Sequence, residues 1–114
     1  MIEEFGLPRD LVAFKPGTST RFRDIYYEMI FKKLLASIET NDVIAGANFW
    51  AYSGVGRAAE NQVFWKKGDD LLGDPPMEEQ GLNSVFDSDT STWKIIEAYC
   101  RKINSFTEKN KTSK

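Results

Sequence analysis

The chain has 114 residues, a net charge of −2, 41% hydrophobic residues and 13% aromatic residues. This length allows at most one domain, the composition is that of a globular chain, and the lack of a basic excess argues against nucleic acid as a partner. The sequence contains no histidine, which excludes Ser-His-Asp and Cys-His catalysis and most zinc sites, so any chemistry must use carboxylates, hydroxyls, lysine or arginine.

The first predicted elements are a strand end at residues 1–5, a turn at residues 6–10 and a loop at residues 11–19, because glycine and proline interrupt the apolar pattern there. A helix is predicted from Thr20 to Ile38, where apolar residues recur at three- and four-residue spacing. Its predicted apolar stripe consists of Phe22, Ile25, Tyr26, Met29, Ile30, Leu34 and Ile38, and its N-cap candidates are Thr18, Ser19 and Thr20.

A nearly uncharged run at residues 43–52 predicts a strand buried on both faces, as in a parallel sheet covered by helices. Side chains alternate along a strand, so Asn48 and Trp50 share one face while Ala47 and Phe49 share the other. The first face is typical of a strand that looks into a barrel interior. The second, apolar face is typical of one that meets a helix.

Residues 53–90 form a long irregular segment that is not of low complexity, which predicts an ordered functional loop. A second helix is predicted from Ser91 to Ile103, with a polar tail at residues 105–114. Its apolar stripe is Ile95, Ile96, Tyr99 and Ile103, and its cap candidates are Asp89, Thr90 and Ser91. The single cysteine, Cys100, lies among apolar residues of this helix and is predicted to be a buried thiol.

The resulting order, β-α-β-α, predicts a parallel α/β fold. Two strands cannot cover both faces of a sheet, so we expect this segment to be incomplete by itself. No run is long enough to span a bilayer, and no signal peptide follows Met1, which leaves a cytoplasmic protein or a chain whose true start is missing.

Several motifs cover most of residues 1–99. They are Glu3-Glu4-Phe5-Gly6-Leu7-Pro8-Arg9-Asp10, Gly46-Ala47-Asn48-Phe49-Trp50-Ala51, Gly73-Asp74-Pro75-Pro76, Gln80-Gly81 and Asn83-Ser84-Val85-Phe86-Asp87-Ser88-Asp89. In this order and at these separations they resemble family 5 glycoside hydrolases, in particular their endo-β-1,4-mannanases. The resemblance implies that residues 1–104 are the C-terminal portion, strands seven and eight, of a TIM (β/α)8 barrel. It also implies retaining hydrolysis of β-mannan by a secreted parent enzyme without a cofactor.

The resemblance implies site residues as well. Glu4, directly before Phe-Gly, corresponds to the nucleophile, and Glu3 is expected to point away and pack or pair outside the site. Trp50 corresponds to the aromatic floor of the sugar site, with Asn48 on the same face. Trp65 is a candidate for a more distant sugar subsite, and a purely structural role as a loop anchor is an equally good interpretation.

The chain departs from the family at the acid/base glutamate and at the histidine, arginine and tyrosine of earlier strands, which are absent together with the N-terminal barrel segment. Two alternatives therefore stay open: an inactive remnant, or the same chemistry on β-1,4-glucan. The acids of the long loop do not follow the EF-hand spacing, so no metal site is expected from Asp69, Asp70, Asp74, Glu78 and Glu79.

Overall fold

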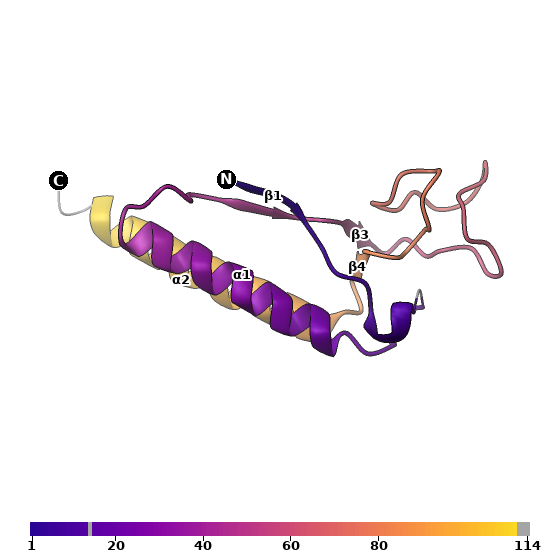
Figure 1. The fold of residues 1–114 in the computed structure, drawn as a ribbon, viewed down its shortest axis with the longest axis horizontal. Helices are drawn as coiled ribbons and strands as arrows, with labels where there is room; N and C mark the ends of the chain where they lie inside the picture. The colour runs from indigo at the N-terminus through magenta and orange to yellow at the C-terminus, as the bar shows by residue number, and fades with distance from the viewer. Residues whose placement is uncertain (14, 112–114) are drawn as a thin grey trace.

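The computed structural model describes residues 1–13 and 15–111. The molecule is elongated, with principal extents of 55 × 26 × 21 Å, and a long loop projects beyond one end of two helices (Figure 1). Its elements in chain order are β1 (Ile2–Phe5), the 3-10 turn η1 (Asp10–Val12), α1 (Arg21–Glu39), β2 (Ala47–Phe49), β3 (Tyr52–Gly54), β4 (Val85–Phe86) and α2 (Thr90–Lys111).

The strands form two parallel pairs. β1 pairs with β2, placing Ile2 opposite Ala47 and Phe5 opposite Phe49. β3 pairs with β4. The predicted single strand at residues 43–52 is therefore wrong in its bounds: residues 43–46 lie outside it, and the chain breaks at Trp50–Ala51 before pairing again with a new partner.

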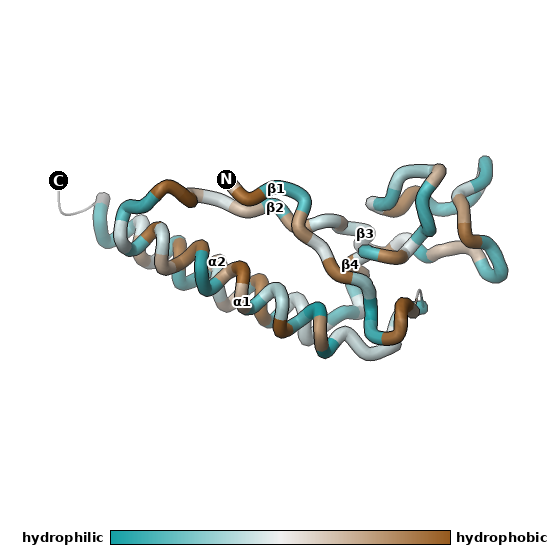
Figure 2. The backbone as a smooth tube through the Cα atoms, in the orientation of Figure 1, coloured by the Kyte–Doolittle hydropathy of each residue, from teal (hydrophilic) through white to brown (hydrophobic). Residues whose placement is uncertain are grey.

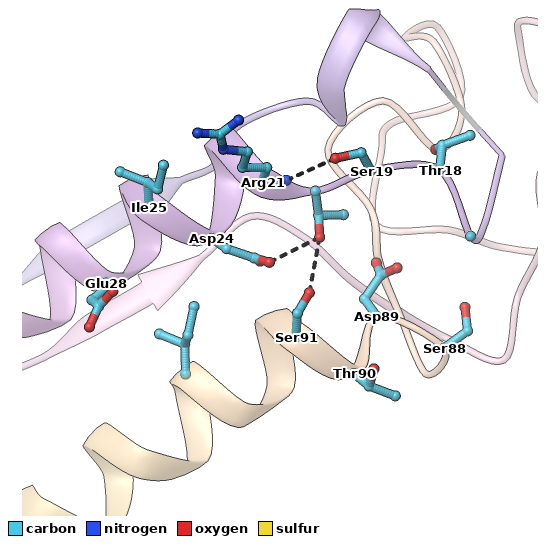
Figure 3. Close-up of a pocket in the computed structure, with 13 residues that line it drawn as sticks. Thr18, Ser19, Arg21, Asp24, Ile25, Glu28, Ser88, Asp89, Thr90 and Ser91 are labelled. Atoms are coloured by element: carbon cyan, nitrogen blue, oxygen red, sulfur yellow. Dashed lines mark hydrogen bonds between the residues drawn. The ribbon is translucent and has the colours of Figure 1, made fainter.

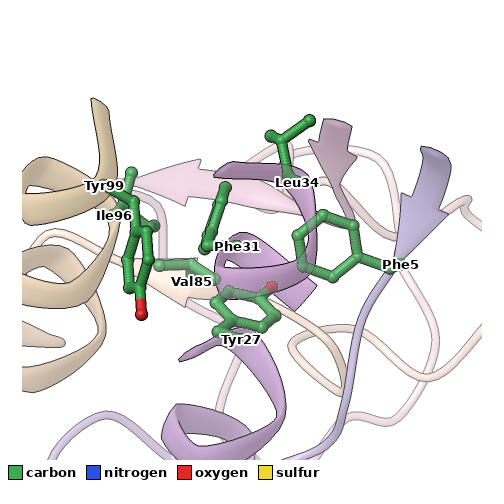
Figure 4. Packing of buried hydrophobic residues seen from close by; sticks show 7 residues of the cluster. All are labelled: Phe5, Tyr27, Phe31, Leu34, Val85, Ile96 and Tyr99. Carbon is green, nitrogen blue, oxygen red and sulfur yellow. The ribbon is translucent and has the colours of Figure 1, made fainter. Parts of the chain in front are cut away.

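Helices α1 and α2 pack against each other and against β1 and β2 (Figure 1). Hydrophobic and hydrophilic segments alternate along both helices (Figure 2), as expected for helices that bury one side only. The core gathers side chains from β1, α1, β4 and α2 (Figure 4), and consists of Phe5, Tyr27, Phe31, Leu34, Val85, Ile96 and Tyr99.

Aromatic contacts dominate this core. The rings of Phe5 and Tyr27 meet edge to face with centroids 5.0 Å apart, and Phe31 stacks on Tyr99 at 6.0 Å. The edge-to-face contact is favourable because the electropositive ring edge of one residue meets the electronegative face of the other. The core thus ties β1 to both helices.

The first helix was predicted correctly in extent, but its buried side only in part: Leu34 of the predicted stripe is in the core, and Tyr26, Ile30 and Ile38 pack against it. Phe22, Ile25 and Met29 of the predicted stripe are 61%, 55% and 46% exposed, whereas Arg23 and Tyr27 are fully buried. Apolar residues occupy most of the circumference of α1, so their spacing alone could not identify the side that meets β1 and α2.

The second helix has the predicted buried stripe, since Ile96 and Tyr99 are in the core and Ile95 and Ile103 pack against it. It runs to Lys111, well past the predicted end at Ile103. Cys100 is exposed, so its predicted burial is wrong: it follows Tyr99 directly and is rotated away from the core side of the helix. No helix in the described part of the chain has the length and apolarity needed to cross a membrane.

Candidate active site

The candidate nucleophile lies in an irregular part of β1. Ile2 and Phe5 both pack toward the helices, yet they are three residues apart while their partners on β2 are only two apart. This extra residue is a β-bulge, and Glu4 within it has a positive φ of 56°. Left-handed backbone is costly for a residue with a side chain and is found preferentially at functional sites.

The bulge changes the expectation for the two neighbouring glutamates. Both Glu3 and Glu4 are exposed, between two residues that face the helices. Glu3 therefore does not pack or pair on the helix side as simple alternation predicts. Among the residues that the structure describes, none donates a hydrogen bond to the Glu4 carboxylate, which is open to solvent.

Of the other site candidates, Asn48 lies in β2 and Trp50 directly follows it. Ala47 and Phe49 pack against the core, while Asn48 between them is exposed. Trp50 follows Phe49 and is half-buried. The predicted division of this segment into a helix-facing side and an opposite side, with Asn48 on the latter, is confirmed.

The structure makes the backbones that carry Glu4 and Trp50 direct neighbours. The Trp50 amide donates to the carbonyl of Phe5, the residue after Glu4, at 2.7 Å. The Tyr27 hydroxyl lies 3.5 Å from the Trp50 carbonyl oxygen, and burial raises the pKa of Tyr27. The peptide bond between Trp50 and Ala51 is cis. The exposed Glu4 and the half-buried Trp50 thus belong to adjacent, hydrogen-bonded strand ends.

Trp65 lies apart from this pair, in the projecting loop. Its ring is half-buried and its indole N–H donates to the Asp69 carbonyl at 3.2 Å. This contact is the one expected of a residue that anchors its own loop. A subsite role for Trp65 remains a prediction.

The loop acids mainly fold the loop itself. Asp69 accepts from the amide of Lys66 at 2.8 Å, and Asp70 accepts from the amide of Arg57 at 2.9 Å. The buried Asp74 accepts from the Gly81 amide at 2.8 Å. Within residues 1–13 and 15–111, no three metal-ligating side chains gather into a cluster.

A buried charge cluster beneath the loop was not expected from the sequence. The guanidiniums of Arg9 and Arg23, both fully buried, reach the same carboxylate, Asp89; the Arg23 distance is 3.3 Å. Burial, followed by the charge of Arg9, lowers the pKa of Arg23. The feature of the sequence that could have indicated this cluster is Arg23, a charged residue among the apolar residues of α1. A buried charge requires a partner of opposite charge.

This cluster joins four segments. Arg23 donates to the carbonyls of Leu7 and Ser84, each at 2.8 Å, and Asp89 accepts from the Phe86 amide at 2.9 Å. The chain leaving β1 is therefore locked to β4 and to the start of α2. Glu4 lies near the end of β1, directly before the chain segment that the cluster holds. The cluster therefore fixes the position of the strand end that carries Glu4.

A surface pocket lies between the N-termini of α1 and α2 (Figure 3). Thr20 bridges them, with its hydroxyl 3.1 Å from Asp24 and 3.2 Å from the Ser91 hydroxyl. Neither Glu4 nor Trp50 lines this pocket. This pocket lies between the two helix N-termini and is separate from the candidate active site.

Comparison with known proteins identifies the family. The family described as "GH family 5 beta-mannosidase-like" matches residues 1–108. This chain belongs to glycoside hydrolase family 5. No curated protein sequence matches it.

Solved structures of one family 5 mannosidase, from Rhizomucor miehei, are similar to this chain. The crystal structure of that enzyme aligns with a TM-score of 0.78 at 32% identity, and a glutamate-to-alanine variant with 0.78 at 31%. A further glutamate-to-alanine variant, in complex with mannosyl-fructose, aligns with 0.77 at 32%. Each match covers 96% of this chain and 27% of the solved one, so this chain spans about a quarter of that enzyme.

Proposed function

We propose that this chain supplies the nucleophile and part of the sugar site of a retaining glycoside hydrolase that acts on mannose-containing substrates. The observation that carries the proposal is the pairing of Glu4 and Trp50 on hydrogen-bonded strand ends. Family membership over residues 1–108 supports the reaction class, and the mannosyl-fructose complex of the Rhizomucor miehei enzyme supports a mannoside as substrate.

In this proposal β1 and β2 are strands seven and eight of a (β/α)8 barrel, and their carboxyl ends form part of its catalytic face. The Glu4 carboxylate attacks the anomeric carbon, the glycosidic bond breaks, and a covalent glycosyl-enzyme forms. The indole of Trp50 packs against the apolar C–H face of the sugar ring. A secreted parent enzyme that acts on β-1,4-mannan is the specific form of the proposal.

Complete turnover requires a second carboxyl about 5 Å from the nucleophile, to protonate the leaving oxygen. Glu3 is the residue next to Glu4, but adjacent positions on one strand cannot stand on opposite sides of a glycosidic bond. We therefore propose that the acid/base group comes from a barrel segment outside these 114 residues. By itself the chain is expected to release no reducing sugar from mannan.

A mechanism-based label tests the nucleophile without the missing acid. 2-Deoxy-2-fluoro-β-mannosyl fluoride carries a leaving group, fluoride, that needs no protonation, and its glycosyl-enzyme hydrolyses slowly. We expect a covalent adduct on the peptide that contains Glu4, measured by mass spectrometry. The adduct should be lost in Glu4→Gln and kept in the matched control Glu3→Gln.

The second candidate function is a chain without catalytic activity, favoured because the Glu4 carboxylate is open to solvent and no described residue donates a hydrogen bond to it. Failure of the wild-type chain to be labelled at any reagent concentration supports this candidate. Labelling that survives Glu4→Gln would show that the nucleophile assignment is wrong. Repeating the experiment with the gluco-configured reagent separates mannoside from glucoside preference.

A further inference from the structure

The segment Trp50–Ala51 lies between two glycines that come from distant parts of the chain. A Cβ atom placed on Gly6 would lie 2.4 Å from the Trp50 carbonyl oxygen, and one placed on Gly73 would lie 2.2 Å from the Cβ of Ala51. Nonbonded carbon atoms prefer separations of about 3.5–4.0 Å. Both approaches are therefore possible only because neither residue has a side chain.

Hydrogen bonds hold the same segment from both ends. The Ala51 amide donates to the Asn83 carbonyl at 3.1 Å, and the Ala51 carbonyl accepts from the Val85 amide at 2.8 Å. With the Trp50 amide bound to Phe5, the segment is fastened to β1 on one side and to residues 83–85 on the other. A displacement of Ala51 is thus passed directly to Trp50.

Gly73 is itself fixed by buried polar contacts of the loop. Its amide donates to the Ser53 hydroxyl at 3.1 Å, and that hydroxyl lies 2.7 Å from the Ser84 hydroxyl. The next residue, Asp74, is buried and lies 3.2 Å from the same Ser84 hydroxyl. These contacts therefore hold Gly73, within the loop between β3 and β4, against Ala51.

We propose that Gly73 is a positioning residue, which sets the place of the Trp50 indole relative to Glu4 through its contact with Ala51. The proposal rests on the proposed role of Trp50 in sugar binding. Gly73 does not have a left-handed φ. An alanine there is compatible with the backbone conformation, and its effect comes from the collision with Ala51.

The test uses the indole N–H resonances of the 114-residue chain, which has three tryptophans. The Trp50 resonance is assigned by its loss in Trp50→Phe. We expect Gly73→Ala to shift the Trp50 resonance more than that of Trp93. The matched control is Gly46→Ala, whose new Cβ would meet only the Met1 side chain at 3.5 Å and should leave Trp50 unshifted.

A second substitution makes the test specific to the contact. Ala51→Gly removes the methyl group that the new side chain strikes, so combining it with Gly73→Ala should move the Trp50 resonance back toward its position in Ala51→Gly alone. A folded Gly73→Ala protein with an unshifted Trp50 resonance, or no relief from Ala51→Gly, would overturn the proposal.

Ser53→Ala covers the case in which Gly73→Ala does not fold, because it removes the acceptor for the Gly73 amide without adding volume. A Trp50 shift in the folded Ser53→Ala protein is expected, and its absence counts against the proposal. Titration with β-1,4-mannobiose then separates the two claims. A Trp50 resonance that does not shift on addition of the sugar but does shift in Gly73→Ala would refute the role of Trp50 in sugar binding. It would leave the positioning role of Gly73 intact.

Discussion

The helix-and-strand body and the loop end, residues 53–89, are held together in different ways. The body is joined by apolar and aromatic contacts, such as those of Phe5 with Tyr27 and Phe31, in which each ring touches several others. Apart from Val85 and Phe86, which are fully buried, the loop end is joined by single donor–acceptor pairs and by the close approach of Gly73 to Ala51. In a packed core the stabilisation is distributed over many contacts of each side chain. A buried polar group instead depends on one or two hydrogen-bond partners, and losing one leaves it unsatisfied.

The largest expected effect comes from breaking the charge cluster that connects these two regions. Asp89→Ala would leave the buried guanidiniums of Arg9 and Arg23 without their common carboxylate. Removing one partner of a buried ion pair costs about 3–5 kcal/mol, since the remaining charge stays desolvated. Urea unfolding measures this loss in the free energy of unfolding.

The exposed pair of Asp87 and Arg57 provides the control for this substitution. Their side chains are 48% and 39% exposed, so Asp87→Ala should change the free energy of unfolding little. Amide exchange sharpens the result: in Asp89→Ala the Phe86 amide loses its acceptor and should exchange faster, while amides in the middle of α1 keep their protection. Equal losses in the two variants would contradict the role given to the cluster.

A smaller effect is expected from a cavity inside the body. Leu34 is 4% exposed, and Leu34→Ala should cost roughly 3 kcal/mol through lost burial and an unfilled space. Met29→Ala on the same helix is the control, because Met29 is 46% exposed and should cost much less. Urea unfolding compares the two variants. A larger loss for Met29→Ala would mean that α1 buries the side of the helix that carries Phe22, Ile25 and Met29.

The body was the more predictable region because local periodicity encodes most of it. The extent of α1 follows from its apolar spacing, and the division of β2 into Asn48 on one side and Phe49 on the other follows from strand alternation. The buried side of α1 was predicted only in part, since apolar residues surround that helix. The bulge at Glu4 was missed because alternation assumes a regular strand.

The loop end could not be derived in this way because its contacts join residues far apart in the sequence. Arg9 and Asp89 are separated by 80 positions, and nothing local in either segment indicates the other. Gly73 and Ala51 meet only through the course of the whole loop. The family motifs indicated Glu4 and Trp50 as candidate site residues, but they did not indicate which residues hold them in place.

The smallest effect concerns the start of α1, where the carboxylate of Asp10 caps the helix together with the predicted candidate Ser19, whose hydroxyl accepts from the Arg21 amide at 3.4 Å. Asp10 accepts from the backbone amides of Arg21 and Phe22 at 3.2 and 3.1 Å, and the N-cap residue Thr20 makes no side-chain capping bond. The hydrogen bond from the Ser19 hydroxyl is the main cause that lowers the pKa of Asp10 below its ordinary value.

The lowered pKa fixes the sign of the pH dependence. A carboxyl whose folded-state pKa lies below its unfolded value stabilises the fold above the unfolded pKa, about 3.9 for aspartate, and loses that contribution as the pH falls through the folded pKa. Asp10→Asn should therefore be less stable than wild type at pH 7, with a difference that shrinks through the acid range. Urea unfolding at a series of pH values measures this difference, and Glu60→Gln, an exposed loop acid, is the control. A deficit that is as large in acid as at neutrality would mean that the shape of the Asp10 side chain, rather than its charge, holds the start of α1.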